Sequence, residues 1–172
     1  MKHIALTLMT LALLSTVAYA DTPLPPPHAE TVCSPSKRIC ATTDPAENTT
    51  VARNQATQRL LWSLAGWHRW LFVADDGISA VVGYDGQNLL PLDAPLSQPV
   101  LGFYRKGGLV RVVTLGELYK QLTDIPRTAS HLAWVSSVGF NKHNQFELTL
   151  PDGRHITFSL LGQRTRAAAN GT

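Results

Sequence analysis

The sequence has little charge of either sign, little cysteine and no apolar run long enough to cross a membrane comfortably. Only 16% of its 172 residues are Asp, Glu, Lys or Arg, and the net charge is +3. These charges are spread along the chain, which argues against nucleic acid as a partner, because phosphate binding needs clustered Lys and Arg. Beyond the N-terminal region no apolar run approaches the roughly 20 residues that span a bilayer, so we expect no integral membrane segment there.

The N-terminal residues 1–20 have the three parts of a secretory signal peptide. Lys2 supplies a basic start, residues 4–17 are apolar, and Ala18-Tyr19-Ala20 gives the small residues that signal peptidase recognises. We therefore expect cleavage after Ala20 and a mature protein in the periplasm or outside the cell. Loss of Lys2 lowers the net charge from +3 to +2.

Only two cysteines, Cys33 and Cys40, occur in the sequence. In an oxidising compartment an isolated pair is most simply a disulfide. A metal site needs more ligands, and a redox pair usually has the spacing Cys-x-x-Cys, so we expect neither a metal nor another cofactor. A turn at Ser36-Lys37 would place the two cysteines opposite each other in a hairpin, whereas a shift of one residue would put them on opposite faces.

Proline content and the period of the apolar residues divide the rest of the chain. Residues 21–30 contain four prolines and are predicted to form an extended, mobile leader. Residues 31–161 are predicted to form a single β domain, and residues 162–172 a flexible tail. Short runs in which apolar and polar residues alternate indicate an all-β fold of antiparallel hairpins, arranged as a sandwich, a barrel or blade-like sheets.

The clearest hairpin lies around Pro151-Asp152-Gly153, where the alternation stacks Phe146 on Phe158 and Leu148 on Ile156. Three more are predicted around Ser36-Lys37, Asp75-Asp76-Gly77 and Lys106-Gly107-Gly108, and residues 131–140 are predicted to form one further strand. Thr114 and Glu117 match a capping box, which predicts one short helix near residues 115–122.

Aromatic and histidine side chains gather in two segments and give a candidate binding site. Exposed tryptophans could form a platform for a glycan or a protein partner, whereas buried ones would fill the core, the more frequent outcome for such large apolar side chains. If residues 67–72 form a strand, their period of two puts Trp67 and Trp70 on opposite faces. The candidate binding residues are Trp67, His68, Trp70, His131 and Trp134.

No nucleophile signature such as Gly-x-Ser-x-Gly occurs in the sequence. Ser130 precedes His131, but neighbours on a strand point to opposite faces, so we do not expect these side chains to meet. Asp85 and Asp124 are the acids considered for orienting such a pair. The alternative that stays open is an envelope hydrolase or a metal-dependent enzyme that uses His68, His131 and Asp85, which would have to converge in one cleft.

Three blocks of the sequence are similar to short exported bacterial proteins of no assigned role. They are Gly-Trp-His-Arg-Trp-Leu-Phe-Val-Ala-Asp-Asp-Gly at residues 66–77, Gly-Tyr-Asp-Gly at 83–86 and Thr-Ala-Ser-His-Leu-Ala-Trp at 128–134. This resemblance implies export from a bacterial cell and brings no catalytic residue with it. Together with the missing catalytic signatures, it favours a non-catalytic binding or adaptor module of the cell envelope, with an envelope protein or glycan as its partner.

Overall fold

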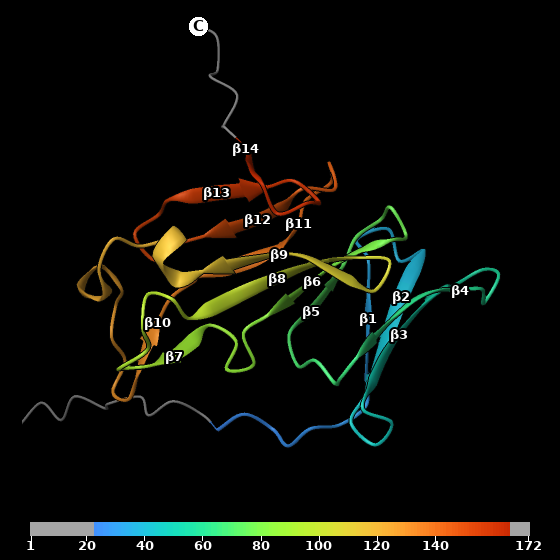
Figure 1. Ribbon diagram of the computed structural model, residues 1–172, viewed down its shortest axis with the longest axis horizontal. Helices are drawn as coiled ribbons and strands as arrows, with labels where there is room; N and C mark the ends of the chain where they lie inside the picture. Colours follow the sequence, from blue (N-terminus) through green and yellow to red (C-terminus); the bar gives the residue numbers. More distant parts are fainter. Residues whose placement is uncertain (1–22, 166–172) are drawn as a thin grey trace, which may run out of the picture.

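The computed structural model describes residues 23–165, which form four antiparallel sheets and two short 3-10 helices (Figure 1). Three of the sheets have four strands and one has two. This architecture confirms the all-β class expected from the alternation of apolar and polar residues. The predicted signal peptide, residues 1–20 with cleavage after Ala20, lies outside the described residues, as do residues 166–172 of the predicted tail.

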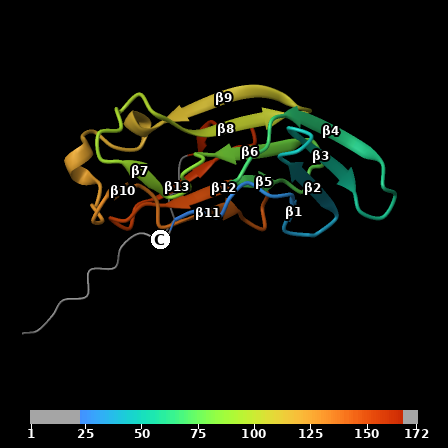
Figure 2. The same ribbon diagram turned by 90° about the horizontal axis from the view of Figure 1, so that it is seen from below.

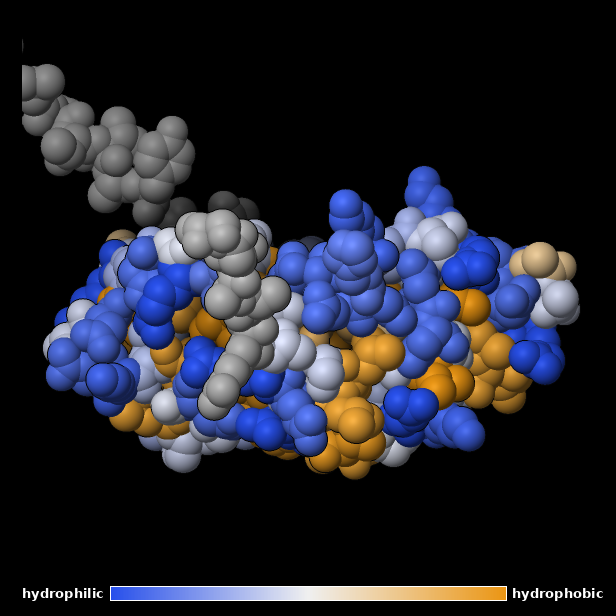
Figure 3. Space-filling view, turned by 90° about the horizontal axis from the view of Figure 1, so that it is seen from above, coloured by the Kyte–Doolittle hydropathy of each residue, from blue (hydrophilic) through white to orange (hydrophobic). Residues whose placement is uncertain are grey.

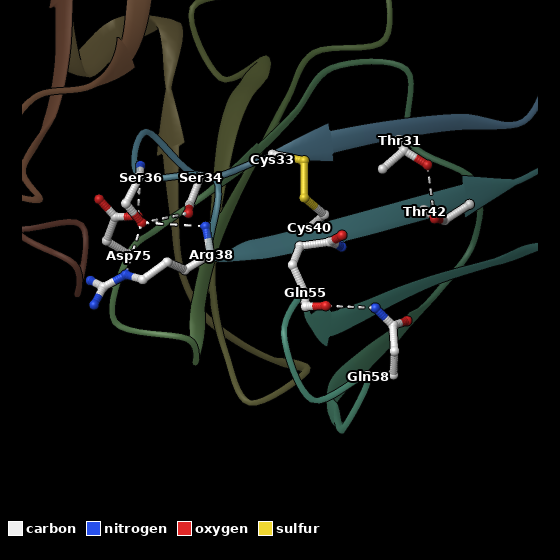
Figure 4. The surroundings of a disulfide bond; sticks show 10 residues. All are labelled: Thr31, Cys33, Ser34, Ser36, Arg38, Cys40, Thr42, Gln55, Gln58 and Asp75. Carbon is white, nitrogen blue, oxygen red and sulfur yellow. Dashed lines mark hydrogen bonds between the residues drawn. A yellow bond between two sulfur atoms is a disulfide. The ribbon is translucent and has the colours of Figure 1, made fainter.

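The first sheet has its strands in sequence order, and its first hairpin carries a disulfide. Its strands are β1 (Glu30–Cys33), β2 (Ile39–Asp44), β3 (Thr49–Asn54) and β4 (Leu60–Ala65). Cys33 lies opposite Cys40, and the two form the predicted disulfide with their Cα atoms 4.0 Å apart (Figure 4). The Ser36 N–H of the intervening turn donates to the Asp75 carboxylate at 3.1 Å, which ties this hairpin to the next sheet.

The middle sheet confirms two further hairpins. Its strands are β5 (Leu71–Val73), β6 (Ser79–Gly83), β8 (Pro99–Arg105) and β9 (Gly108–Thr114), in that order. The two-residue turn between β8 and β9 consists of Lys106 and Gly107, with φ angles of 49° and 83°. Positive φ at both positions is the signature of a type I′ turn, whose twist matches that of a hairpin.

The third sheet has the predicted register and extends past the predicted end of the domain. Its strands are β11 (Ser137–Phe140), β12 (Phe146–Thr149), β13 (His155–Phe158) and β14 (Arg164–Thr165). Phe146 pairs with Phe158 and Leu148 with Ile156, as the alternation predicted. Beyond residue 161, where a flexible tail was expected, Thr165 pairs with Thr157.

The prediction of a single strand over residues 131–140 was wrong, because the chain changes partners in the middle of this segment. β10 (His131–Ala133) pairs with β7 (Leu89–Pro91) in the two-stranded sheet, whereas β11 belongs to the third sheet. Between them, the Trp134 N–H donates to the Asn88 carbonyl at 3.1 Å and the Ser136 N–H to the Thr149 carbonyl at 2.9 Å. A continuous apolar pattern does not reveal such a change of neighbour.

The short helical segment after β9 consists of two separate turns. These are η1 (Leu115–Glu117) and η2 (Leu122–Asp124). The capping box is present, and the Thr114 N–H donates to Glu117 Oε1 at 3.1 Å. The helix does not continue to residue 122. Tyr119, between the two turns, is buried, and its hydroxyl donates to the Trp134 carbonyl at 2.6 Å.

The strands β5 and β6 of the middle sheet pack on both faces, whereas its edge strand β9 is mostly exposed. Against the third sheet the middle sheet packs a core that includes Phe103, Phe146 and Phe158. Against the first sheet it packs a smaller core that includes Trp62 and Val73. Figures 1 and 2 both show the first sheet at one end of the molecule and β7 and β10 at the other. The described residues therefore form antiparallel sheets that pack on one another through two apolar cores.

Candidate binding groove

Two cavities border the N-terminal residues 23–28, which we call the N-terminal segment. The first, about 330 Å³, is lined by Trp67, Arg69, Trp70 and Gln87 together with Pro25 and His28. The second, about 400 Å³, is lined by Tyr84, Leu89 and His131 together with Pro23 and Leu24. We call the surface formed by Trp67, Arg69, Trp70, Tyr84, Leu89 and His131 the groove. Figure 1 shows the N-terminal segment, in blue, running along the lower side of the fold towards β1.

The connection between β4 and β5 supplies the two groups that hold the N-terminal segment. The indole Nε1 of Trp67 donates to the His28 carbonyl at 2.8 Å. The Nη1 of Arg69 donates to the Pro25 carbonyl at 2.7 Å. Both are short hydrogen bonds to main-chain oxygens, so these two donors recognise the backbone of the segment.

Arg69 is fixed in place by its neighbours. Its guanidinium Cζ lies 4.8 Å from the ring centroid of Trp67, within the range of a cation–π contact. Its Nε forms an ion pair with Asp85 Oδ1 at 3.5 Å. This nitrogen is buried and donates no hydrogen bond. Only 11% of the side chain is exposed. The charge is therefore balanced and largely dehydrated, which strengthens the hydrogen bond that Nη1 donates.

Trp70 forms one wall of the groove and rests on small and aromatic neighbours. A Cβ atom on Gly83 of β6 would lie 2.3 Å from Trp70 Cε3, so only glycine allows the indole to lie this close to the strand. The Trp134 ring packs edge-on against Trp70 with the ring centroids 5.9 Å apart. Trp134 itself is fully buried, and its Nε1 donates to the Gln87 carbonyl at 2.7 Å. It thus supports the groove from beneath.

The two tryptophans expected on opposite faces, Trp67 and Trp70, line the same cavity. The expectation failed because β5 begins only at Leu71, so the period of a strand does not apply to residues 67–70. The sequence pattern did not identify Arg69 as a donor, and the N-terminal segment was treated as mobile. The signal that could have found both is a proline-rich stretch in the same short chain as closely spaced aromatic and arginine side chains.

His68 faces the first sheet. Its backbone N–H donates to Thr43 Oγ1 at 2.8 Å, and its Nε2 lies 3.2 Å from the Ala65 carbonyl. Burial holds the pKa of His68 below its ordinary value, although the hydrogen bond to Ala65 and the charge of Asp85 act in the opposite direction. The neutral ring therefore helps to fix the connection that carries Trp67 and Arg69.

The side chains of Ser130 and His131 meet, contrary to the expectation from strand geometry. Ser130 Oγ lies 2.9 Å from His131 Nδ1. Ser130 stands in the bend before β10, so it does not alternate with His131 as a strand residue would. Both residues line the second cavity. Of the acids considered as orienting groups, Asp85 pairs with Arg69, and Asp124 accepts a hydrogen bond from Gln121.

Residues 23–165 contain no group of three or more His, Cys, Asp or Glu side chains arranged to hold a metal ion, and no helix within them is long and apolar enough to cross a membrane. The strand β9 exposes Leu109, Val110 and Val112. In the space-filling view of Figure 3, apolar areas are separated by hydrophilic side chains.

Comparisons with known proteins do not assign a function. No protein-family model matches the sequence, and no curated protein sequence matches it. Among solved structures, the fold is similar to dihydro-heme d1 dehydrogenase NirN in complex with DHE, with a TM-score of 0.41 and 17% sequence identity. The alignment covers 83% of this chain and 28% of that one, so the chain spans less than a third of the length of this structural neighbour.

Proposed function

We propose that this protein is an exported, non-catalytic binding module of the cell envelope and that the groove is its binding site. The observation that carries this proposal is the pair of donors, Trp67 Nε1 and Arg69 Nη1, that hold main-chain carbonyls of an extended segment. Aromatic rings beside two convergent donors are what a peptide-binding surface requires, because the rings supply apolar area and the donors fix the register.

Export is supported by several independent features. The N-terminal sequence has the parts of a signal peptide. The Cys33–Cys40 disulfide is typical of an oxidising compartment. We also interpret residues 66–77, 83–86 and 128–134 as similar to short exported bacterial proteins. We accordingly propose a bacterial periplasmic or secreted location for a mature chain that begins at Asp21, with an envelope protein as partner in preference to a glycan, because the groove donors contact peptide carbonyls.

The binding role is tested by capture from an envelope extract with the mature chain, residues 21–172, carrying a C-terminal tag. We expect a stoichiometric partner that untagged protein competes away and that Arg69→Gln fails to capture. Arg53→Gln is the matched control, because the exposed Arg53 also donates to a carbonyl, that of Gln58 at 3.1 Å, but lies outside the groove. Capture that is equal for the two variants, or no capture by folded wild-type protein, would contradict the proposal.

A hydrolase is the second candidate, and the 2.9 Å contact between Ser130 Oγ and His131 Nδ1 favours it. A hydroxyl within hydrogen-bond distance of an imidazole is the geometry of a nucleophile and its base. On this hypothesis, Ser130→Ala abolishes hydrolysis of ester or peptide substrates while the thermal midpoint stays unchanged. If no substrate is hydrolysed by the wild type, or if Ser130→Ala keeps full activity, this pair has no catalytic role.

A further inference from the structure

The N-terminal segment has a composition that favours one particular backbone conformation. Prolines occupy positions 23, 25, 26 and 27. Proline fixes φ near −65° and lacks an N–H, so such a stretch cannot join a sheet and instead favours the polyproline II helix. Its carbonyls accept no main-chain hydrogen bond within the segment in that conformation, so they are open to donors from elsewhere in the fold.

The spacing of the two bound carbonyls matches this conformation. Polyproline II has three residues per turn, so residues three apart present their carbonyls on the same side. Pro25 and His28 are three apart, and these are the two residues whose carbonyls accept hydrogen bonds from Arg69 and Trp67. The two donors, Trp67 and Arg69, are two residues apart in the connection between β4 and β5. This one connection therefore binds both carbonyls of a single turn of the segment.

The N-terminal segment fills the groove incompletely. All of its residues are exposed, and Leu24 retains 42% of its accessible surface. Cavities of about 330 and 400 Å³ remain beside it, one next to Trp67 and Trp70 and the other next to Tyr84 and His131. The His28 side chain makes a hydrogen bond inside the segment, with its Nδ1 3.0 Å from the Pro26 carbonyl oxygen. A segment with larger side chains at the corresponding positions would bury more apolar surface in the same register.

We propose that the groove binds a proline-rich, extended segment of a partner protein and that residues 23–28 are a weaker internal occupant which this partner displaces. The proposal rests on the proposed function, since it specifies the chemistry of the ligand that the groove takes. It also gives the groove a regulatory property, because the covalent link keeps the internal occupant at a high effective concentration. If the groove is closed for 90% of the time, the apparent affinity for a partner falls about tenfold.

The test uses the whole mature chain and a fluorescent synthetic peptide with the sequence of residues 21–30. In the segment variant, Pro25→Gly, Pro26→Gly and Pro27→Gly together weaken the internal occupant without shortening the chain. We expect the segment variant to bind the peptide about tenfold more tightly than the wild type. A peptide in which the same three prolines are replaced by glycine is expected to bind neither protein.

The groove is located by two further substitutions made in the segment variant. Trp67→Phe keeps a ring beside Arg69 and removes only the indole donor, so the fold is retained and peptide binding is expected to weaken about threefold to tenfold. Arg69→Gln is expected to weaken it further, whereas Arg53→Gln should leave it unchanged. Thermal unfolding of each variant shows that the protein tested is folded.

Three results would overturn this inference. The first is a folded segment variant that does not bind the peptide, and the second is binding that Trp67→Phe and Arg69→Gln leave unchanged. The third is a concentration-dependent dimer that the peptide dissociates, because the occupant would then be the segment of a second copy. Continued capture of an envelope protein through Arg69 in the absence of peptide binding would overturn the ligand class alone and leave the proposed binding function standing.

Discussion

Replacing Phe146 by alanine is expected to lower the free energy of unfolding by about 3–5 kcal/mol, the cost of deleting a buried aromatic ring. Phe146 is fully buried. Its ring centroid lies 5.2 Å from that of Phe72, 5.7 Å from that of Phe103 and 5.1 Å from that of Phe140. These partners come from both the middle and the third sheet, so the cavity cannot close by the movement of one side chain.

Urea unfolding monitored by circular dichroism measures this loss of stability. Phe146→Leu should cost less, because it leaves a smaller cavity. Leu109→Ala is the control for truncation of an apolar side chain, since Leu109 is 54% exposed, and it should change the free energy of unfolding by no more than about 0.5 kcal/mol. A Phe146→Ala variant as stable as Leu109→Ala would show that the packing between the middle and third sheets is wrong.

Gly107→Ala is expected to destabilise the protein by about 3 kcal/mol through two additive causes. The φ angle of 83° is in the left-handed region, where a residue with a Cβ is strained by ~1–2 kcal/mol. The added Cβ would also lie 2.3 Å from the Ser63 carbonyl oxygen in β4, so the hairpin turn and the first sheet would have to separate. Overpacking of this kind typically costs ~1–3 kcal/mol.

Gly153→Ala is the matched control, because it separates the two causes. Gly153 also lies in a hairpin turn and has a φ angle of 86°, but nothing lies within 4 Å of the position of its Cβ. This variant should therefore show the backbone strain alone, about 1 kcal/mol. Equal thermal midpoints for the two variants would mean that the turn at Gly107 does not pack against β4.

Local features of the fold were predictable because neighbouring residues encode them. The pairing of Phe146 with Phe158 follows from the alternation on either side of one turn, and the pairing of Cys33 with Cys40 is one of the two registers that the sequence left open for their hairpin. The split of residues 131–140 between two sheets was not predictable in this way. It depends on hydrogen bonds from Trp134 and Ser136 to residues far away in sequence, which no local period reports.

The candidate site was predictable only in part. The aromatic block drew attention to Trp67 and Trp70, and these residues do line a cavity. The N-terminal segment, which contacts Trp67 and Arg69, lies about forty residues earlier in the sequence. A proline-rich sequence has no apolar periodicity from which the position of this segment in the fold could be predicted. Ser130 and His131 were expected to point apart because Ser130 was treated as a strand residue, whereas it lies in the bend before β10. Whether the residue next to a strand shares its alternation thus decides whether two side chains meet.

The packing of β6 has a consequence for how freely this sequence can change over time. Ser79, Ala80 and Val81 of β6 are buried at consecutive positions, so side chains on both faces of this strand must fit their neighbours. The strand β12, by contrast, alternates between buried and exposed residues, and its exposed positions are constrained only by solubility and strand propensity. Substitutions should therefore accumulate in natural variants on the outer faces of the first and third sheets. In β6, changes should arise mainly in pairs, each compensated by a second change in the sheet that it touches.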